Sequence, residues 1–280
     1  MREDGPSITA FAAAAHRAAH QLLEDGRILK DPLAVPITGW PPERLIEEAQ
    51  TDMWKQGMRF FITARSAFAE AALQQAVEER GFTQLVLLGA GLDTFAYRNP
   101  HGDRLRIFEV DHPATQTWKR GRLAEAAIGV PGWVTYVPVN FESQSFVERL
   151  AESGFDPGER TFFFWLGVIP YLTEEAISGT FRSVADLPGG AEIAFDYGEP
   201  PDTLNEDLQR MHRERAERVA AIGEPFISHF TGEQMDALVK DEGLEIVEDL
   251  GLRAMAERFA PQAAPFMPEG GAHVALARAV

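Results

Sequence analysis

One short segment constrains the fold of this chain more than any other. Residues Gln84–Leu88 have the sequence Gln-Leu-Val-Leu-Leu and run directly into Gly-Ala-Gly at positions 89–91. A short and almost wholly apolar run of this kind is typical of a strand that is buried on both faces, as strands of parallel sheets are. Glycines directly after such a strand let the backbone approach a ligand closely. The segment therefore predicts a parallel sheet with a ligand site at the end of this strand.

Strand and helix signals alternate along the rest of the chain and support such a sheet. Further strands are expected at 105–111, 134–139, 161–168, 191–197, 244–250 and 273–279. Helices are expected at 113–127, after the N-cap residue Thr173, at 204–222, and from the capping box Thr231–Gln234 to Gly243. Five strand–helix units followed by a pair of strands predict one doubly wound α/β sheet with helices on both faces.

The first eighty residues and the 202–225 segment are expected to be helical attachments to this sheet. Helices are predicted over 7–23 and 63–80, with a proline-rich loop after Asp31 and with Gly81 ending the second helix. We expect a single domain over 1–280. Its parts would be an N-terminal helical extension (1–80), a ligand-binding core (81–200), a cap insertion (201–230) and a C-terminal part of the core (231–280).

Charge and cysteine content exclude several functional classes. Asp and Glu number 43 against 26 Lys and Arg, which gives a net charge of −17 and disfavours nucleic acid and anionic membranes as partners. The chain has no cysteine, and no His, Asp and Glu cluster has metal-ligand spacing, so no metal site is expected. Acidic residues in Arg2–Asp4 argue against a signal peptide, and the longest apolar stretch, 161–172, is short for a membrane span. We expect a cytoplasmic protein.

The turn after the first strand has the spacing Gly-x-Gly-x-x-Thr over residues 89–94. Thr94 replaces the third glycine of the dinucleotide-binding fingerprint, and Asp93 lies where a phosphate group would be bound. Both departures argue against an anionic diphosphate ligand. An NAD(P)-dependent reductase is therefore a weaker alternative. The other alternative is that these residues form a plain tight turn that binds no ligand.

Two acidic residues occupy the end of the second predicted strand. Glu109 follows Gly89 by 20 positions, and Asp111 follows Gly91 by 20 positions. Either residue fits the carboxylate that binds both ribose hydroxyls of a nucleoside. Because the two acids flank a single valine, we expect their side chains to point to opposite sides of the strand, so that only one of them faces the ligand. Either acid alone is also compatible with a solvated strand end, but together with the glycine turn the pair favours a nucleoside site.

These residues resemble a known family. The motifs that carry the resemblance are Arg65, Leu85–Thr94 and Phe108–Pro113, with further matches at 31–34, 165–168, 171–172, 195–197 and 223–225. They are similar to the leucine carboxyl methyltransferase family, and in particular to its bacterial branch of S-adenosylmethionine-dependent O-methyltransferases, some of which act on natural products. The resemblance implies a class I methyltransferase fold, which is a Rossmann-like doubly wound sheet of seven strands with the last one antiparallel.

The resemblance also implies roles for individual residues. Arg65 would pair with the methionine carboxylate of S-adenosyl-L-methionine. The turn Gly89, Ala90 and Gly91 would line the methionine and ribose, and Asp111 or Glu109 would bind the ribose. Asn140 and Phe141 would bind the adenine, and the remaining cofactor contacts would be Asp93, Trp165, Leu166 and Gly167. The family more often has Asp at position 140, and many relatives carry Glu at position 166, where leucine suggests a more apolar substrate.

The implied reaction is methyl transfer to a carboxylate or hydroxyl of a small molecule, such as a secondary metabolite, with S-adenosyl-L-homocysteine as the product. Alignment of the reactants is the main requirement, because a carboxylate acceptor is already ionised and only a hydroxyl acceptor needs a base. Candidate acceptor contacts are Tyr171, Tyr197 and His212, and neither His212 nor His229 is assigned as a base. A non-catalytic cofactor-binding relative and methylation of protein C-termini remain alternatives, and the oligomeric state is open.

Overall fold

The computed structural model describes residues 7–50, 53–141 and 144–280. The acidic start, Arg2–Asp4, on which the signal-peptide argument rests, lies outside these residues. The seven strands are β1 (Gln84–Leu88), β2 (Arg106–Asp111), β3 (Val134–Pro138), β4 (Thr161–Trp165), β5 (Ala191–Gly198), β6 (Leu244–Gly251) and β7 (Ala272–Ala279).

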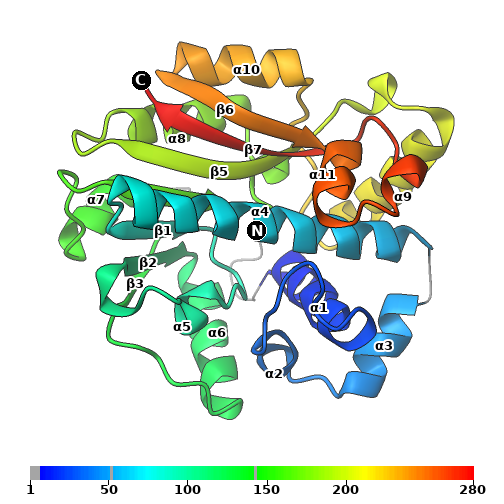
Figure 1. The fold of residues 1–280 in the computed structure, drawn as a ribbon, viewed down its shortest axis with the longest axis horizontal. Helices are drawn as coiled ribbons and strands as arrows, with labels where there is room; N and C mark the ends of the chain where they lie inside the picture. Colours follow the sequence, from blue (N-terminus) through cyan, green and yellow to red (C-terminus); the bar gives the residue numbers. More distant parts are fainter. Residues whose placement is uncertain (1–6, 51–52, 142–143) are drawn as a thin grey trace. The chain divides into compact units, whose positions relative to one another are not determined.

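The strands form one sheet in the order β3-β2-β1-β4-β5-β7-β6 (Figure 1). The pairs β1–β4, β2–β3 and β4–β5 are parallel. Strand β7 runs antiparallel to both of its neighbours, β5 and β6. The predicted doubly wound sheet with an antiparallel last strand is confirmed. Every residue of β1 and β4 is buried. Their continuous apolar sequences suit strands that are covered on both faces of the sheet.

The chain forms two compact units. Unit 1 comprises Met1–Ala67 and Gly89–Phe155, and unit 2 comprises Phe68–Leu88 and Asp156–Val280. These boundaries differ from the expected four-part division, in which the core began at residue 81. That division, and its single domain, stay a prediction.

Unit 1 contains most of the helical N-terminal extension. Its helices are α1 (Ile8–Leu23), α2 (Ala34–Thr38), α3 (Pro42–Gln50), the first part of α4 (Met53–Arg80), α5 (Phe95–Arg98), α6 (Pro113–Glu125) and α7 (Phe146–Glu152). The prediction of a loop after Asp31 is wrong over α2 and α3. Pro36 and Pro42 lie in the first turns of these helices, where the missing N–H costs no intrahelical hydrogen bond.

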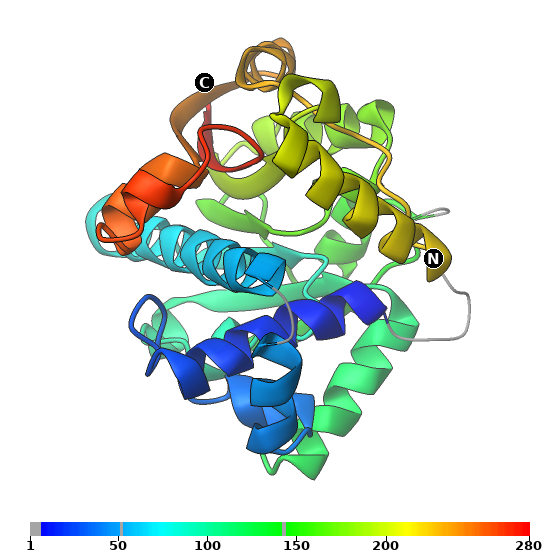
Figure 2. The same cartoon turned by 90° about the vertical axis from the view of Figure 1, so that its right-hand side faces the viewer.

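Helix α1 packs through its alanines. Ala14 is buried in one cluster with Ile37, Leu92 and Leu123, and Ala18 in another with Ala34 and Leu45. Figure 2 shows α1 in dark blue against α2 and α3 in lighter blue. Small side chains let α1 approach closely, so one turn of the helix lies against Leu92 in the glycine turn.

Unit 2 is built on β1 and β4–β7. Its helices are the rest of α4, α8 (Glu174–Ala185), α9 (Glu206–Ala221), α10 (Gly232–Asp241) and α11 (Leu252–Phe259), and Figure 1 shows α10 alongside β6. Edge-to-face contacts of Phe181 with Trp165 and Phe195 fill the core. The predicted caps are confirmed, since Thr173 accepts from the backbone N–H of Ala176 and Thr231 forms a complete capping box.

Two further features of unit 2 concern the region after β4. The strand ends at Trp165, three residues before the predicted end, because Gly167 adopts a positive φ of 76° and turns the chain. Helix α9, predicted as a cap, is confirmed as a helix and has no buried residue. Of the helices in the described ranges, none is long and apolar enough to cross a membrane.

Candidate active site

The glycine turn wraps around the end of β2. The backbone N–H groups of Gly89 and Ala90 both donate to the carbonyl oxygen of Val110, at 2.9 and 3.2 Å. The N–H of Gly91 donates to Oδ2 of Asp111 at 2.5 Å. Gly91 has a φ of 48°, in the left-handed region that favours glycine. Because all three N–H groups are used within the protein, this turn does not present the row of donors that cradles a diphosphate.

Glu109 and Asp111 have different environments. They are two positions apart on β2, so their side chains point to the same face of the strand. The expectation that they point to opposite sides is wrong. Glu109 is 0% exposed, with Lys119 Nζ at 2.7 Å and the Tyr97 hydroxyl at 3.0 Å on its two oxygens. Asp111, at the carboxyl end of β2, is 8% exposed. Of the two acids, Asp111 is therefore the one positioned for a ligand.

The carboxylate of Asp111 is held by backbone donors on both oxygens. Besides the Gly91 bond, the N–H of His112 donates to Oδ1 at 2.6 Å. Burial raises the pKa of the Asp111 carboxyl above its ordinary value, although the Gly91 and His112 donors and Lys119 act to lower it. Each oxygen keeps a further lone pair, so the group can accept additional hydrogen bonds.

Asp93 has its own partners. Its Oδ1 atom accepts from the N–H of Phe95 at 2.7 Å, which supports the start of α5. Burial alone would raise the pKa of this carboxyl, but the positive charges of Arg17, Arg98 and Lys119 hold it below its ordinary value. Asp93 is therefore an ionised acid whose charge is balanced by nearby cations.

Two predicted adenine contacts follow β3. Residues Asp111 and Pro138 are in register, and the N–H of Val139 donates to the carbonyl of Asp111 at 2.9 Å. Asn140 is the next residue, and Phe141 after it is 43% exposed. The structure thus brings Asp111, Asn140 and Phe141 to the same carboxyl edge of unit 1.

The remaining predicted cofactor residue of unit 1 is Arg65. It lies on α4, is buried, and places its guanidinium 5.4 Å from the ring centroid of Phe61. Its pairing with a carboxylate stays a prediction.

In unit 2, the predicted residues after β4 separate into core and surface positions. Trp165 is buried, with its ring 5.3 Å from Phe181, whereas Leu166 and Gly167 are partly exposed. The N–H of Gly167 donates to Oδ1 of the buried Asp196. The sequence-based site omitted Asp196, although the Phe195–Tyr197 motif contains it.

Tyr171 and His212, both predicted to contact the acceptor, meet at one aromatic side chain. The ring centroid of Phe226 lies 5.5 Å from that of Tyr171 and 5.7 Å from that of His212. His212 Nε2 is also 2.8 Å from His229 Nε2. Burial lowers the pKa of His212, and the charges of His229 and Arg215 lower it further. Phe226 was missed because it follows the predicted helix without any periodic pattern.

Tyr197 lies apart from this aromatic group; it is buried and belongs to a chain of half-buried polar side chains. Its hydroxyl donates to Asp249, and its ring stacks on His273 with centroids 4.8 Å apart. His273 contacts Asp249 through Nδ1 at 2.8 Å and Glu199 through Nε2 at 3.4 Å. Burial would lower the pKa of His273, but the two carboxylates raise it above its ordinary value. The structure thus places Tyr197 in a link between β5, β6 and β7.

Comparison with known proteins decides the family. The model of the family described as leucine carboxyl methyltransferase matches residues 10–185. The chain belongs to this family. It is 31% identical over 275 residues to the Bacillus subtilis protein YktD, described as an S-adenosyl-L-methionine-dependent methyltransferase, with 89% of this chain and 90% of YktD covered. A Saccharopolyspora erythraea protein of the same description is 31% identical over 197 residues, covering 69% of this chain and 67% of that protein.

Solved structures agree on the fold of this leucine carboxyl methyltransferase family member. A Thermobifida fusca protein described as a methyltransferase superimposes with a TM-score of 0.60 at 16% identity, covering 99% of this chain and 96% of the other. A DUF574 family protein from Streptomyces avermitilis gives 0.58 at 17% identity, covering 95% and 97%. The chain is accordingly a methyltransferase with S-adenosyl-L-methionine as its cofactor.

The groups at the end of β2 fit this cofactor. A nucleoside without phosphates needs a carboxylate for its ribose and a backbone that allows close approach, and Asp111 and the glycine turn are of these two kinds. The turn uses its N–H groups internally, which suits a ligand without a diphosphate. Among the residues with described positions, no three His, Asp or Glu side chains form a metal-binding group.

Proposed function

We propose that this chain is an O-methyltransferase that acts on a carboxylate or hydroxyl of a small organic molecule, such as a secondary metabolite. The observation that carries the proposal is the carboxylate of Asp111, which is fixed by the N–H groups of Gly91 and His112 at 2.5 and 2.6 Å. A carboxylate held in this way needs no rearrangement before it accepts the two ribose hydroxyls. Asn140 and Phe141 would bind the adenine, and Arg65 the methionine carboxylate.

The aromatic group in unit 2 supports a small organic acceptor. Tyr171, Phe226 and His212 lie on the segments that follow β4 and β5, which is the edge where ligands bind in open α/β sheets. The backbone N–H of Ile227 donates to the carbonyl of Pro170 at 2.7 Å, so the segment carrying Phe226 is fastened to the loop carrying Tyr171. Aromatic rings on a fixed backbone give a planar, apolar surface for an acceptor.

The chemistry asks little beyond alignment. When bound, S-adenosyl-L-methionine supplies a methyl group already activated by a cationic sulfonium. The protein has to hold the acceptor oxygen in line and keep water out, and such positioning contributes on the order of 7–11 kcal/mol. A carboxylate acceptor needs no base. A hydroxyl acceptor would need one, and the His212–His229 pair is then the candidate because its lowered pKa keeps it neutral near pH 7.

The remaining expectations belong to the same proposal. The whole chain would work as one catalytic domain in the cytoplasm, with α9 as the cap over the acceptor. Methylation of a protein C-terminus is the competing acceptor class.

Two measurements test the proposal. Calorimetry should show binding of S-adenosyl-L-homocysteine to the wild-type chain, and a labelled-methyl assay should show transfer to members of a panel of aromatic acids, aliphatic acids and phenols. Transfer confined to C-terminal peptides would overturn the small-molecule proposal. Binding of the product without transfer to any acid, phenol or peptide would identify a non-catalytic relative.

A further inference from the structure

We propose that Asp31, in the N-terminal extension, is a positioning residue of the cofactor site. It lies outside the glycine turn, yet it holds the far end of that turn through Thr94. The inference rests on the use of S-adenosyl-L-methionine on which the proposed function also depends.

Asp31 is joined to the turn by a short hydrogen bond. The hydroxyl of Thr94 donates to Oδ2 of Asp31 at 2.6 Å, and both side chains are buried, Asp31 with 1% exposure. The Nε atom of Arg98, which is on the helix that follows the turn, lies 3.3 Å from Oδ1 of Asp31. A buried, charge-assisted hydrogen bond of this kind is short and directional.

Arg17 on α1 connects Asp31 to the middle of the turn. Its Nε atom lies 3.7 Å from Oδ2 of Asp31, and its Nη2 atom donates to the carbonyl of Leu92 at 2.6 Å. Its Nη1 atom is 4.0 Å from Oδ2 of Asp93. The same helix also approaches Gly91 of the turn, since a Cβ added there would lie 3.0 Å from Cβ of Ala10. Helix α1 therefore contacts the turn from Gly91 to Asp93.

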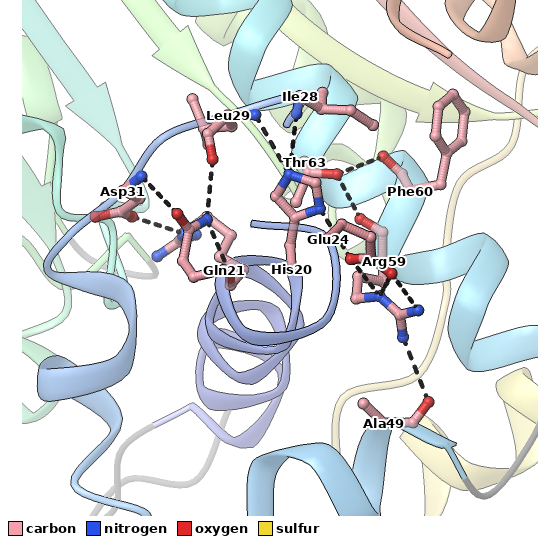
Figure 3. A network of polar contacts seen from close by, with 11 residues as sticks. His20, Gln21, Glu24, Ile28, Leu29, Asp31, Ala49, Arg59, Phe60 and Thr63 are labelled. Atoms are coloured by element: carbon pink, nitrogen blue, oxygen red, sulfur yellow. Dashed lines mark hydrogen bonds and ion pairs between the residues drawn. The ribbon is translucent and has the colours of Figure 1, made fainter. Parts of the chain in front are cut away.

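The position of Asp31 is itself fixed by the end of α1 (Figure 3). Oε1 of Gln21 accepts from the N–H of Asp31 at 3.0 Å, and Nε2 of Gln21 donates to the carbonyl of Leu29 at 2.9 Å. Nε2 of His20 accepts from the N–H groups of Ile28 and Leu29 at 3.1 and 3.4 Å. The carbonyl of Asp31 also accepts from the N–H of Ala34 at 3.1 Å. With its backbone held on both sides, the Asp31 carboxylate has little freedom to follow Thr94 if the turn moves.

The turn is thus held by carboxylates at two positions, Gly91 and Thr94. Asp111 binds the N–H of Gly91, and Asp31 binds the hydroxyl of Thr94. Removing the charges of Asp31 and Arg17 from water costs free energy, so apolar side chains of similar size would often give a fold of equal stability. Apolar side chains would not supply a directed hydrogen bond to Thr94, the residue at the position of the third glycine of the dinucleotide-binding fingerprint. Asp31 therefore acts on cofactor binding through Thr94.

The test compares Thr94→Val, Thr94→Ser and Asp31→Asn in the full-length chain by calorimetry with S-adenosyl-L-homocysteine. Valine keeps the shape of threonine and removes the hydroxyl, whereas serine keeps the hydroxyl. The matched control is Arg59→Gln, which breaks the partly buried Arg59–Glu24 ion pair of the same extension (2.6 Å). Glu24 keeps its contact with His20 Nδ1 at 3.0 Å, and the hydrogen bonds and ion pairs described for Arg59 and Glu24 involve no residue of the turn. Urea unfolding of each variant measures stability separately.

We expect Thr94→Val to weaken S-adenosyl-L-homocysteine binding about tenfold, and Asp31→Asn, whose amide keeps an acceptor oxygen for the Thr94 hydroxyl, to weaken it by a smaller factor. Thr94→Ser should bind as the wild type does. The double variant Asp31→Asn/Thr94→Val should lose about as much affinity as Thr94→Val alone, because both changes act on the same hydrogen bond. Arg59→Gln should lower stability and leave the affinity unchanged.

Three results would overturn the inference. They are wild-type affinity in Thr94→Val, equal losses in Thr94→Val and Thr94→Ser, or an equal loss in Arg59→Gln, which would show general loosening of the extension. Absence of binding to the wild-type chain would instead overturn the proposed function and this inference together.

Discussion

The backbone N–H of Gly167 donates to Oδ1 of Asp196 at 2.5 Å, across the parallel pair β4 and β5. The turn after β4 is therefore fastened by an acid on the neighbouring strand, as the turn after β1 is fastened by Asp111. In both cases a glycine with positive φ supplies the donor. Each turn forms part of an edge at which the chain is proposed to bind its ligands.

Replacement of Asp196 should loosen the turn after β4. Asp196→Ala leaves the N–H of Gly167 without its charged acceptor, so we expect the free energy of unfolding to fall by about 1.5–3 kcal/mol. Asp196→Asn keeps an acceptor oxygen and should lose less. Urea unfolding of both variants checks this, and equal stability of Asp196→Ala and the wild type would contradict it.

Asp111→Asn should weaken binding of S-adenosyl-L-homocysteine about 10- to 100-fold, since a hydrogen bond to a charged group contributes about 1.5–3 kcal/mol. The raised pKa of Asp111 adds a pH effect. The affinity of the wild type should fall as the pH drops from 7 towards about 4, at a higher pH than an ordinary aspartate would give. Calorimetry over this range measures both effects, and a pH-independent affinity would show that the ionised carboxylate is not needed.

The buried pair Glu109–Lys119 should matter for stability rather than for binding. Lys119→Met leaves the buried Glu109 carboxylate without the ammonium at 2.7 Å, and we expect a loss of about 3–5 kcal/mol in the free energy of unfolding. The double variant Glu109→Gln/Lys119→Met removes both charges and should recover much of that loss. If the double variant were less stable than Lys119→Met, the cost would not come from the unpaired charge.

His273 should stabilise the folded chain at acidic and neutral pH and lose this effect at alkaline pH. Its pKa is raised in the folded chain by Asp249 and Glu199, so its stabilising effect is complete below the unfolded value of about 6.5. The effect is lost as the pH rises through the folded pKa. The His212–His229 pair, with lowered pKa values, titrates in the opposite sense. The informative quantity is therefore the stability difference between the wild type and His273→Gln, which should shrink between pH 6 and 9; a constant difference would exclude this linkage.

Local patterns were sufficient to predict the sheet and the glycine turn. Buried strands such as β1 and β4 are continuous apolar runs, and the Gly-x-Gly spacing lies within a few residues. The prolines after Asp31 misled the prediction because proline is accommodated in the first turn of a helix as well as in a loop.

Long-range polar pairs had no such local signal. Thr94 and Asp31 are 63 positions apart, and Tyr197 and Asp249 are 52 apart, so only the folded chain brings them together. The distinction between Glu109 and Asp111 was also out of reach, because it depends on Lys119 and Tyr97 arriving from other elements.

The unburied helix α9 has a consequence for how this protein can diverge. A helix without a buried side chain contributes little of the apolar burial that stabilises the fold, so most substitutions along its sixteen residues should be nearly neutral for folding. The glycine turn, by contrast, is held by buried polar contacts such as those of Asp31 with Thr94 and Arg17, and few substitutions preserve such contacts. If α9 covers the acceptor as proposed, duplicated copies of such a gene could exchange one methyl acceptor for another by mutation in α9 while the residues that bind the methyl donor are inherited unchanged.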